Sequence, residues 1–125
     1  MEYVMIRSCP LSGLALAAAL TLAAPAVVQA HARLVSATPA PGAAVTSPRV
    51  LTLTFSERMA PAFSSFDVIS AAGVKATIRT QVSQDGKTLT GTLARPLPAG
   101  AYVVDWRIAS SDGHRMTGRY DFTVR

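Results

Sequence analysis

Seven short runs of alternating apolar and polar residues, separated by turns rich in Gly and Pro, dominate the chain after residue 32. None of these runs keeps the 3.6-residue period of an amphipathic helix, so each is predicted to be a strand. The expected strands are Arg33–Ala37, Val50–Phe55, Phe66–Ile69, Val74–Gln81, Thr88–Leu93, Tyr102–Ile108 and Gly118–Val124. This number of short strands predicts an all-β fold of two packed antiparallel sheets or a barrel, and we favour the sandwich.

Alternation within the strands also predicts which side chains face the core, because successive residues of a strand point to opposite faces. The predicted core positions are Leu51, Leu53, Phe55, Val104, Trp106, Ile108, Tyr120, Phe122 and Val124. Trp106 is the only tryptophan of the chain. Its place on the inward set of its strand favours a core anchor over an exposed binding residue.

The first thirty residues have the pattern of a cleavable signal peptide. Arg7 stands before an Ala- and Leu-rich segment, Leu11 to Val28, and small residues at Val28 and Ala30 suit signal peptidase. We therefore expect a signal peptide over residues 1–30, cleavage before His31 and one domain over residues 31–125. An uncleaved membrane anchor is the alternative, since the apolar segment approaches the roughly 20 residues that span a bilayer.

Composition after cleavage excludes several kinds of site. Removing 30 of the 125 residues takes away Cys9, the only cysteine, so the remaining domain has neither disulfides nor thiolate metal sites. Eleven Lys and Arg residues against six Asp and Glu residues give a net charge of +5. The basic residues are spread singly, with little aromatic interleaving, and this pattern does not favour nucleic-acid binding.

The two histidines of the sequence stand where a metal ligand would be useful. After cleavage, His31 would offer both its α-amine and a ring nitrogen to one ion. Asp112 and His114 lie two residues apart, a spacing that directs both side chains to the same side of an extended or turn segment. Copper(II) favours tetragonal sets of nitrogen and oxygen donors, so these residues indicate a copper(II) site. Taken alone, Asp-Gly-His is also a common turn beside an exposed histidine.

Several segments together resemble the copper resistance protein C (CopC) family of periplasmic copper carriers. The resemblance runs through the whole expected domain and is most specific near its end. The matching segments are His31-Ala-Arg-Leu-Val-Ser-Ala-Thr-Pro-Ala-Pro-Gly, Leu53-Thr-Phe-Ser-Glu57, Tyr102-Val-Val-Asp-Trp-Arg-Ile-Ala-Ser-Ser-Asp-Gly-His114, Thr117-Gly118 and Phe122-Thr-Val124.

The resemblance implies a cupredoxin-like or immunoglobulin-like Greek-key β-sandwich of about seven strands. It also implies one copper(II) ion per mature chain, held by the terminal amine and ring of His31, the carboxylate of Asp112 and the ring of His114. Glu57 matches a further acidic position near this site in some members of the family. An exposed charge that closes a strand is an equal alternative for Glu57.

Part of the family has a second site, for copper(I), in a methionine-rich loop, because soft thioethers suit the softer ion. This chain differs there. The region from Phe63 to Val82 has neither methionine nor histidine, and after residue 30 only Met59 and Met116 remain. Both are expected to be packing or surface residues. The sequence therefore predicts a protein that binds copper(II) only.

The function expected from these observations is a monomeric, non-enzymatic copper carrier or buffer of the periplasm, acting in copper homeostasis and resistance. The family resemblance suggests an inner-membrane copper importer of the CopD type as a partner. A histidine-brace copper monooxygenase is the main alternative, but Asp112 would fill the coordination position that oxygen chemistry needs. A third possibility is a structural sandwich domain in which both histidines are bystanders, since one fold hosts many functions.

Overall fold

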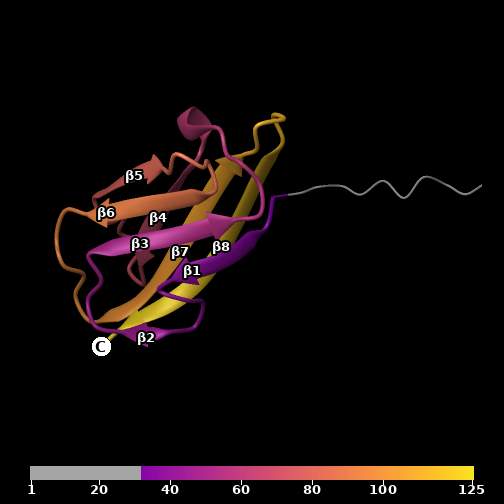
Figure 1. The fold of residues 1–125 in the computed structure, drawn as a ribbon. Coiled ribbons are helices and arrows are strands. Elements are labelled where there is room, and N and C mark those ends of the chain that lie inside the picture. Colours follow the sequence, from indigo (N-terminus) through magenta and orange to yellow (C-terminus); the bar gives the residue numbers. More distant parts are fainter. Residues whose placement is uncertain (1–31) are drawn as a thin grey trace, which may run out of the picture.

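The computed structural model describes residues 32–125, which form two four-stranded sheets packed face to face (Figure 1). The strands are β1 (Leu34–Thr38), β2 (Ala44–Val45), β3 (Val50–Phe55), β4 (Ser65–Ser70), β5 (Ile78–Val82), β6 (Thr88–Leu93), β7 (Gly100–Ala109) and β8 (Arg115–Val124), and a 3-10 turn, η1 (Pro61–Phe63), precedes β4. Within this range the structure contains no helix with the length and apolar character of a membrane span. The expected signal peptide and His31 lie outside the described residues.

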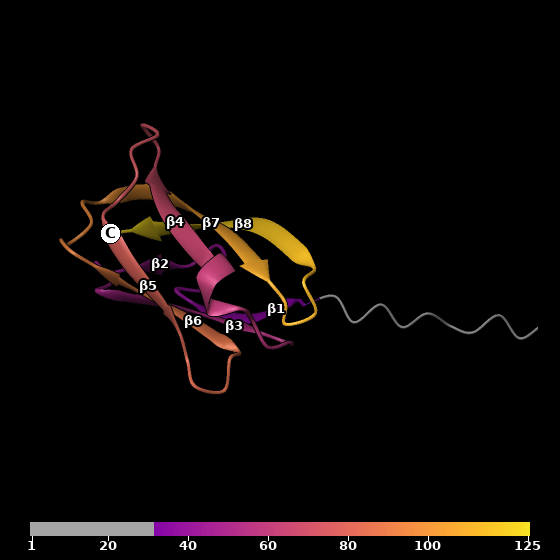
Figure 2. The same ribbon diagram turned by 90° about the horizontal axis from the view of Figure 1, so that it is seen from above.

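The two sheets have the orders β1-β3-β6-β5 and β2-β8-β7-β4. All pairs are antiparallel except β2 with β8, which is parallel. Seen from above, β4, β7 and β8 occupy one layer, and β3 and β6 the other (Figure 2). The longest pairing is the β7–β8 hairpin, which runs from Gly100 opposite Val124 to Ala109 opposite Arg115. This hairpin places the segment Ser110–His114 at one end of the sandwich.

The predicted core is confirmed, because each of its nine side chains is at most 8% exposed. Trp106 anchors it as expected: its ring meets Phe55 edge-on, with centroids 5.0 Å apart. The indole also lies directly against Gly118, where an added Cβ would come within 2.2 Å of the ring. Met59 is buried and Met116 packs partly buried against the core, so both methionines are packing residues.

Residues 32–125 form eight strands where the alternation predicts seven. The additional strand, β2, has only two residues and is too short to show a period. The expected strand Val74–Gln81 begins only at Ile78, because Ser70 to Val74 form a turn in which the Ser70 amide donates to the Val74 carbonyl at 2.9 Å. At the other end of the chain, β8 starts at Arg115, three residues before the predicted Gly118.

Candidate metal centre

The β7–β8 turn, Ser110–His114, is held by hydrogen bonds between its own residues. The Ser110 amide donates to the His114 carbonyl at 2.9 Å, and the Gly113 amide donates to the Ser110 carbonyl at 2.9 Å. Gly113 has φ +92°, a conformation that favours glycine and lets the chain reverse here. The turn therefore has a defined shape before any ligand binds.

Within this turn Asp112 and His114 lie side by side, as their spacing predicts. His114 Nδ1 is 3.1 Å from Asp112 Oδ2, and the His114 amide donates to Asp112 Oδ1 at 3.2 Å. Both side chains are well exposed. An imidazole and a carboxylate are thus adjacent to each other and open to solvent.

The carboxyl of Asp112 is held in its ionised form. The Ser110 hydroxyl donates a hydrogen bond to it, and together with the backbone and side chain of His114 this lowers the pKa of Asp112 below its usual value. Ser110 itself is buried, so its hydroxyl is fixed in place. The turn therefore presents a charged oxygen donor beside a nitrogen donor.

The start of the described chain lies at the same end of the molecule. Ala32 is 1% exposed and belongs to the core. Arg33 is bonded to Ser56 in both directions, from its amide to Ser56 Oγ at 2.9 Å and from the Ser56 amide to its carbonyl at 2.9 Å. Figures 1 and 2 both show the start of the described chain at the same end of the sandwich as the β7–β8 turn.

In the sequence, Glu57 lies between a residue that bonds the chain start and a residue that bonds the β7–β8 turn. The preceding residue, Ser56, bonds the chain start, and the carbonyl of the following residue, Arg58, accepts from the Ser111 amide at 3.0 Å. However, no group of three or more His, Cys, Asp or Glu residues close enough to hold a metal occurs among residues 32–125. The structure therefore brings Asp112 and His114 together but does not add Glu57 to them, and a role for Glu57 stays a prediction.

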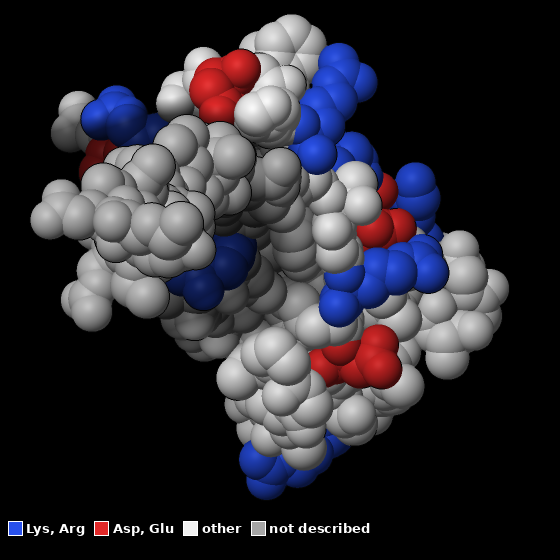
Figure 3. All heavy atoms as spheres, turned by 90° about the vertical axis from the view of Figure 1, so that its right-hand side faces the viewer, with Lys and Arg blue, Asp and Glu red and all other residues white. Residues whose placement is uncertain are grey.

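The charge around this end is mixed. In Figure 3, which faces this side of the molecule, carboxylates lie separately among Lys and Arg side chains on the surface formed by the described residues. Arg115, the residue after His114, lies over the Phe63 ring at 5.9 Å from its centroid. This surface offers a metal cation no general attraction, so affinity has to come from direct ligation.

Two serines that belong to no metal-ligand pattern of the sequence help to shape this end of the molecule. Ser110 orients Asp112, and Ser56 fastens the chain start beside Glu57. A serine two residues before an Asp-Gly pair is a recognisable turn signal that could have revealed Ser110. No local pattern marks Ser56, because its partner lies 23 residues away.

Comparison with known sequences gives a consistent result. The CopC domain profile matches residues 34–125. Copper resistance protein C of Pseudomonas syringae pv. tomato is 41% identical over 107 residues, covering 80% of this chain and 85% of that protein. Protein YobA of Escherichia coli K12 is 39% identical over 101 residues, covering 78% of this chain and 82% of the relative.

Solved structures agree with the sequence comparison. PcoC, described as a methionine-rich copper resistance protein from Escherichia coli, superimposes with a TM-score of 0.71 at 36% identity, covering 77% of this chain and all of PcoC. CopC from Methylosinus trichosporium OB3b gives a TM-score of 0.70 at 36% identity, with 75% of this chain and 93% of that protein covered. The same two-sheet fold is therefore present in all three proteins.

Proposed function

This chain belongs to the CopC family of copper resistance proteins, and we propose that it carries or buffers one copper(II) ion. The observation that supports this most strongly is the Asp112–His114 pair, which is ordered by its own turn at the end of the sandwich where the described chain begins. Imidazole nitrogen and carboxylate oxygen suit copper(II).

The proposed ligands are the α-amine and ring of His31, the carboxylate of Asp112 and the ring of His114. The β7–β8 turn supplies only two donors, which is too few for tight binding of copper(II). The α-amine and ring nitrogen of His31 would add two more by chelating the same ion. Its neighbour in the chain, Ala32, is buried, and Arg33 is tied to Ser56. Glu57, flanked by Ser56 and Arg58, is proposed as a fifth donor, the second carboxylate of the site.

Copper would replace the contact between Asp112 and His114 rather than create a new arrangement. The two atoms that now face each other, His114 Nδ1 and Asp112 Oδ2, are 3.1 Å apart, and both belong to exposed side chains. Binding therefore requires little desolvation of buried groups. Metal ligands must be deprotonated, and the lowered pKa of Asp112 keeps its carboxylate ready.

We propose that the chain binds copper(II) and has no second, copper(I) site. The printed description of PcoC calls that relative methionine-rich. In this chain the described region contains only Met59 and Met116, and both pack in or against the core. The two are not gathered into a methionine-rich cluster of soft thioether ligands such as copper(I) prefers, since they lie 57 residues apart in the sequence and each packs in or against the core.

In the cell, we propose cleavage before His31 and export of the domain 31–125 to the periplasm as a monomer that is not an enzyme. It would take part in copper homeostasis and resistance and deliver copper to an inner-membrane importer of the CopD type. The net charge of +5 would favour encounters with anionic surfaces.

The experiment is to express the whole chain, isolate the exported form, determine its first residue and titrate it with copper(II). The quenching of Trp106 fluorescence and the electron paramagnetic resonance of copper report binding. We expect a His31 terminus and tight one-to-one binding that is strongly weakened in His114→Ala. A different terminus, or binding that is weak and indifferent to His114, would exclude the proposed site.

A further inference from the structure

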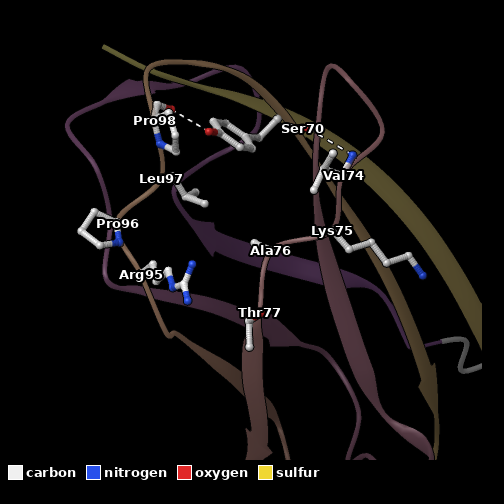
Figure 4. Close-up of a pocket in the computed structure, with 10 residues that line it drawn as sticks. Ser70, Val74, Lys75, Ala76, Thr77, Arg95, Pro96, Leu97 and Pro98 are labelled. Atoms are coloured by element: carbon white, nitrogen blue, oxygen red, sulfur yellow. Dashed lines mark hydrogen bonds between the residues drawn. The ribbon is translucent and has the colours of Figure 1, made fainter.

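A pocket of about 450 Å³ opens at the other end of β7 from the metal centre. Residues of the β4–β5 connection form one wall, and residues between β6 and β7 form the other (Figure 4). Its volume lies within the range of small-molecule sites, roughly 300–1,000 Å³. Tyr102 lines this pocket while the Ser110–His114 turn begins after Ala109, so the two places are roughly 20–25 Å apart along the strand.

The floor of the pocket is apolar and rigid. Leu97 and Tyr102 are buried, and the Tyr102 hydroxyl donates to the Pro98 carbonyl at 2.6 Å. The Tyr102 ring stacks on Phe122, with centroids 5.6 Å apart. The Leu97 amide is also satisfied, by Ser47 Oγ at 2.9 Å. With these polar groups already paired, the floor offers a ligand mainly an aromatic ring and aliphatic carbon.

The walls are also held in place before any ligand binds. On one side, the Val74 amide donates to Ser70 Oγ at 3.1 Å, and the Ala76 amide donates to the Val68 carbonyl at 2.9 Å. The Ala94 amide joins the two sides by donating to the Thr77 carbonyl at 3.0 Å. A ligand would therefore meet a largely preformed site, which lowers the entropic cost of binding.

One cation of the pocket is available to a ligand. None of the ten described residues that line the pocket is acidic, and Arg95 makes no ion pair or hydrogen bond through its side chain within residues 32–125. In Figure 4 its guanidinium extends from one wall toward Ala76 and Thr77 on the other. The ammonium of Lys75 points away and pairs with Asp67 Oδ2 at 3.3 Å.

A second hollow on the molecule, lined by Phe63, Arg107 and Arg115, lacks such a group. Arg107 Nη1 bonds Asp67 Oδ2 at 3.0 Å, and the Arg115 guanidinium lies over the Phe63 ring. Both of its arginines are thus already engaged. Of these two hollows, the pocket at Arg95 combines an apolar floor with an arginine that has no partner in the described chain.

We propose that this pocket binds a monocarboxylate with an apolar body, its carboxylate on Arg95 and its body over Leu97 and Tyr102. A guanidinium pairs with a carboxylate through two parallel hydrogen bonds, and a single unpaired arginine matches a single negative charge. The ligand is either a free small acid or the carboxyl end of a peptide with an apolar last residue. This function is separate from copper binding.

The test follows the amide resonances of the ¹⁵N-labelled exported protein during titration with 3-phenylpropionate and, in parallel, with the neutral 3-phenylpropan-1-ol. We expect the acid to shift the amides of Ala76, Thr77 and Leu97. The alcohol, and the acid added to Arg95→Gln, should bind at least tenfold more weakly. Arg79→Gln is the matched control, because it removes an exposed arginine of the neighbouring strand β5 outside the pocket and should bind as the wild type does.

A second titration identifies the source of the carboxylate by comparing a short peptide ending in Phe, with a free carboxyl end, and the same peptide amidated. Stronger binding of the free acid or of the free peptide assigns the source, and amidation should abolish peptide binding. Absence of localised shifts with both carboxylates, or equal binding to Arg95→Gln, would overturn the proposal. Copper affinity should be the same in Arg95→Gln, so the outcome is independent of the metal centre.

Discussion

Two turns at the end of the sandwich that carries the candidate metal centre have nearly the same internal structure but different last residues. They are Ser83-Gln84-Asp85-Gly86-Lys87, between β5 and β6, and Ser110-Ser111-Asp112-Gly113-His114, between β7 and β8. In each, the serine hydroxyl bonds the aspartate, and the glycine amide donates to the serine carbonyl at 2.9 Å. The amide of the last residue donates to the aspartate Oδ1, at 3.0 Å in the first turn and 3.2 Å in the second.

The two turns are also neighbours in space. The Met59 amide donates to the Gly86 carbonyl at 2.8 Å, and Met59 forms a β-bridge with Ser110. In both turns the serine hydroxyl is the largest cause of a lowered aspartate pKa. The Ser-x-Asp-Gly turn is therefore a structural feature that this fold uses twice, and its geometry alone does not indicate a metal site. In the proposed function, copper binding at one turn comes from His114, where the other turn has a lysine, and from His31 at the chain start.

The largest expected effect comes from giving the second turn the last residue of the first. His114→Lys should lower copper(II) affinity by more than about 100-fold, because a ligand is lost and loss of even an outer-shell partner costs 10–100-fold. The turn itself should persist, with the free energy of unfolding changed by less than about 0.5 kcal/mol at this exposed position. Competition titration and urea unfolding check both. Unchanged affinity would mean that the two turns are equivalent toward copper.

The aspartates of the two turns provide a matched pair for a smaller effect. Asp112→Asn should weaken copper(II) binding about 10- to 100-fold, since an amide oxygen is a poorer donor than a carboxylate. Asp85→Asn removes the equivalent carboxylate from the other turn and should leave copper affinity unaltered. Calorimetric titration of both variants is the measurement. Equal losses would show that general acidity, rather than ligation, attracts the ion.

Replacing the serine of each turn tests whether its hydroxyl orients the aspartate for copper binding. Ser110→Ala removes the hydroxyl that fixes Asp112 and should lower copper(II) affinity by about tenfold, at the low end for outer-shell partners. Ser83→Ala removes the same kind of bond to Asp85 and should have no effect on copper. Both affinities can be measured against a colorimetric chelator. If Ser110→Ala binds copper as tightly as Ser83→Ala, the hydroxyl does not position the ligand.

The smallest expected effect is on the pH dependence of folding stability, and here the two turns should behave alike. Each aspartate has a pKa lowered below its usual value, so without copper each stabilises the folded state above about pH 4. That contribution is lost as the pH falls through the lowered folded-state pKa. Asp85→Asn and Asp112→Asn should therefore be slightly less stable than the wild type at neutral pH, with the difference shrinking as the pH falls below about 4 and vanishing once the pH is below the lowered folded-state pKa. The midpoints of urea unfolding, measured for both variants across this pH range, check this expectation. If only one of the two variants showed the pH-dependent difference in stability, the two turns would not be electrostatically alike.

Most of the fold was predictable because its strands are half buried and alternate strictly. Leu51, Leu53 and Phe55 show this pattern, and all are buried. The strand β2 was not predictable, because its two residues are specified by parallel pairing with the distant end of β8. The late start of β5 has a different reason: the turn at Ser70 takes up Val74, and the next residues pair with β4, where Lys75 forms a bridge with Ile69.

The candidate site was only partly predictable. The proximity of Asp112 and His114 follows from their spacing in one turn, and the structure confirms it. The turn at Asp85 shows that the same hydrogen-bonded Ser-x-Asp-Gly geometry also forms where no histidine follows. What distinguishes the two turns among the described residues is the last residue of each, Lys87 in one and His114 in the other. The contact that holds the chain start, between Arg33 and Ser56, spans 23 residues and is encoded by no local pattern.

The proposal that the chain start and the β7–β8 turn together bind copper(II) is best tested by removing the free α-amine of His31 while keeping its side chain. Copper(II) affinity would be compared between a chain that begins at His31 and one that keeps residues 21–30 before it. Every side chain of the proposed site is retained in the longer chain, but a peptide bond replaces the amine of His31. We expect the copper(II) affinity of the longer chain to be lower by at least about tenfold. Equal affinity in the two chains would contradict it and remove the terminal amine from the site.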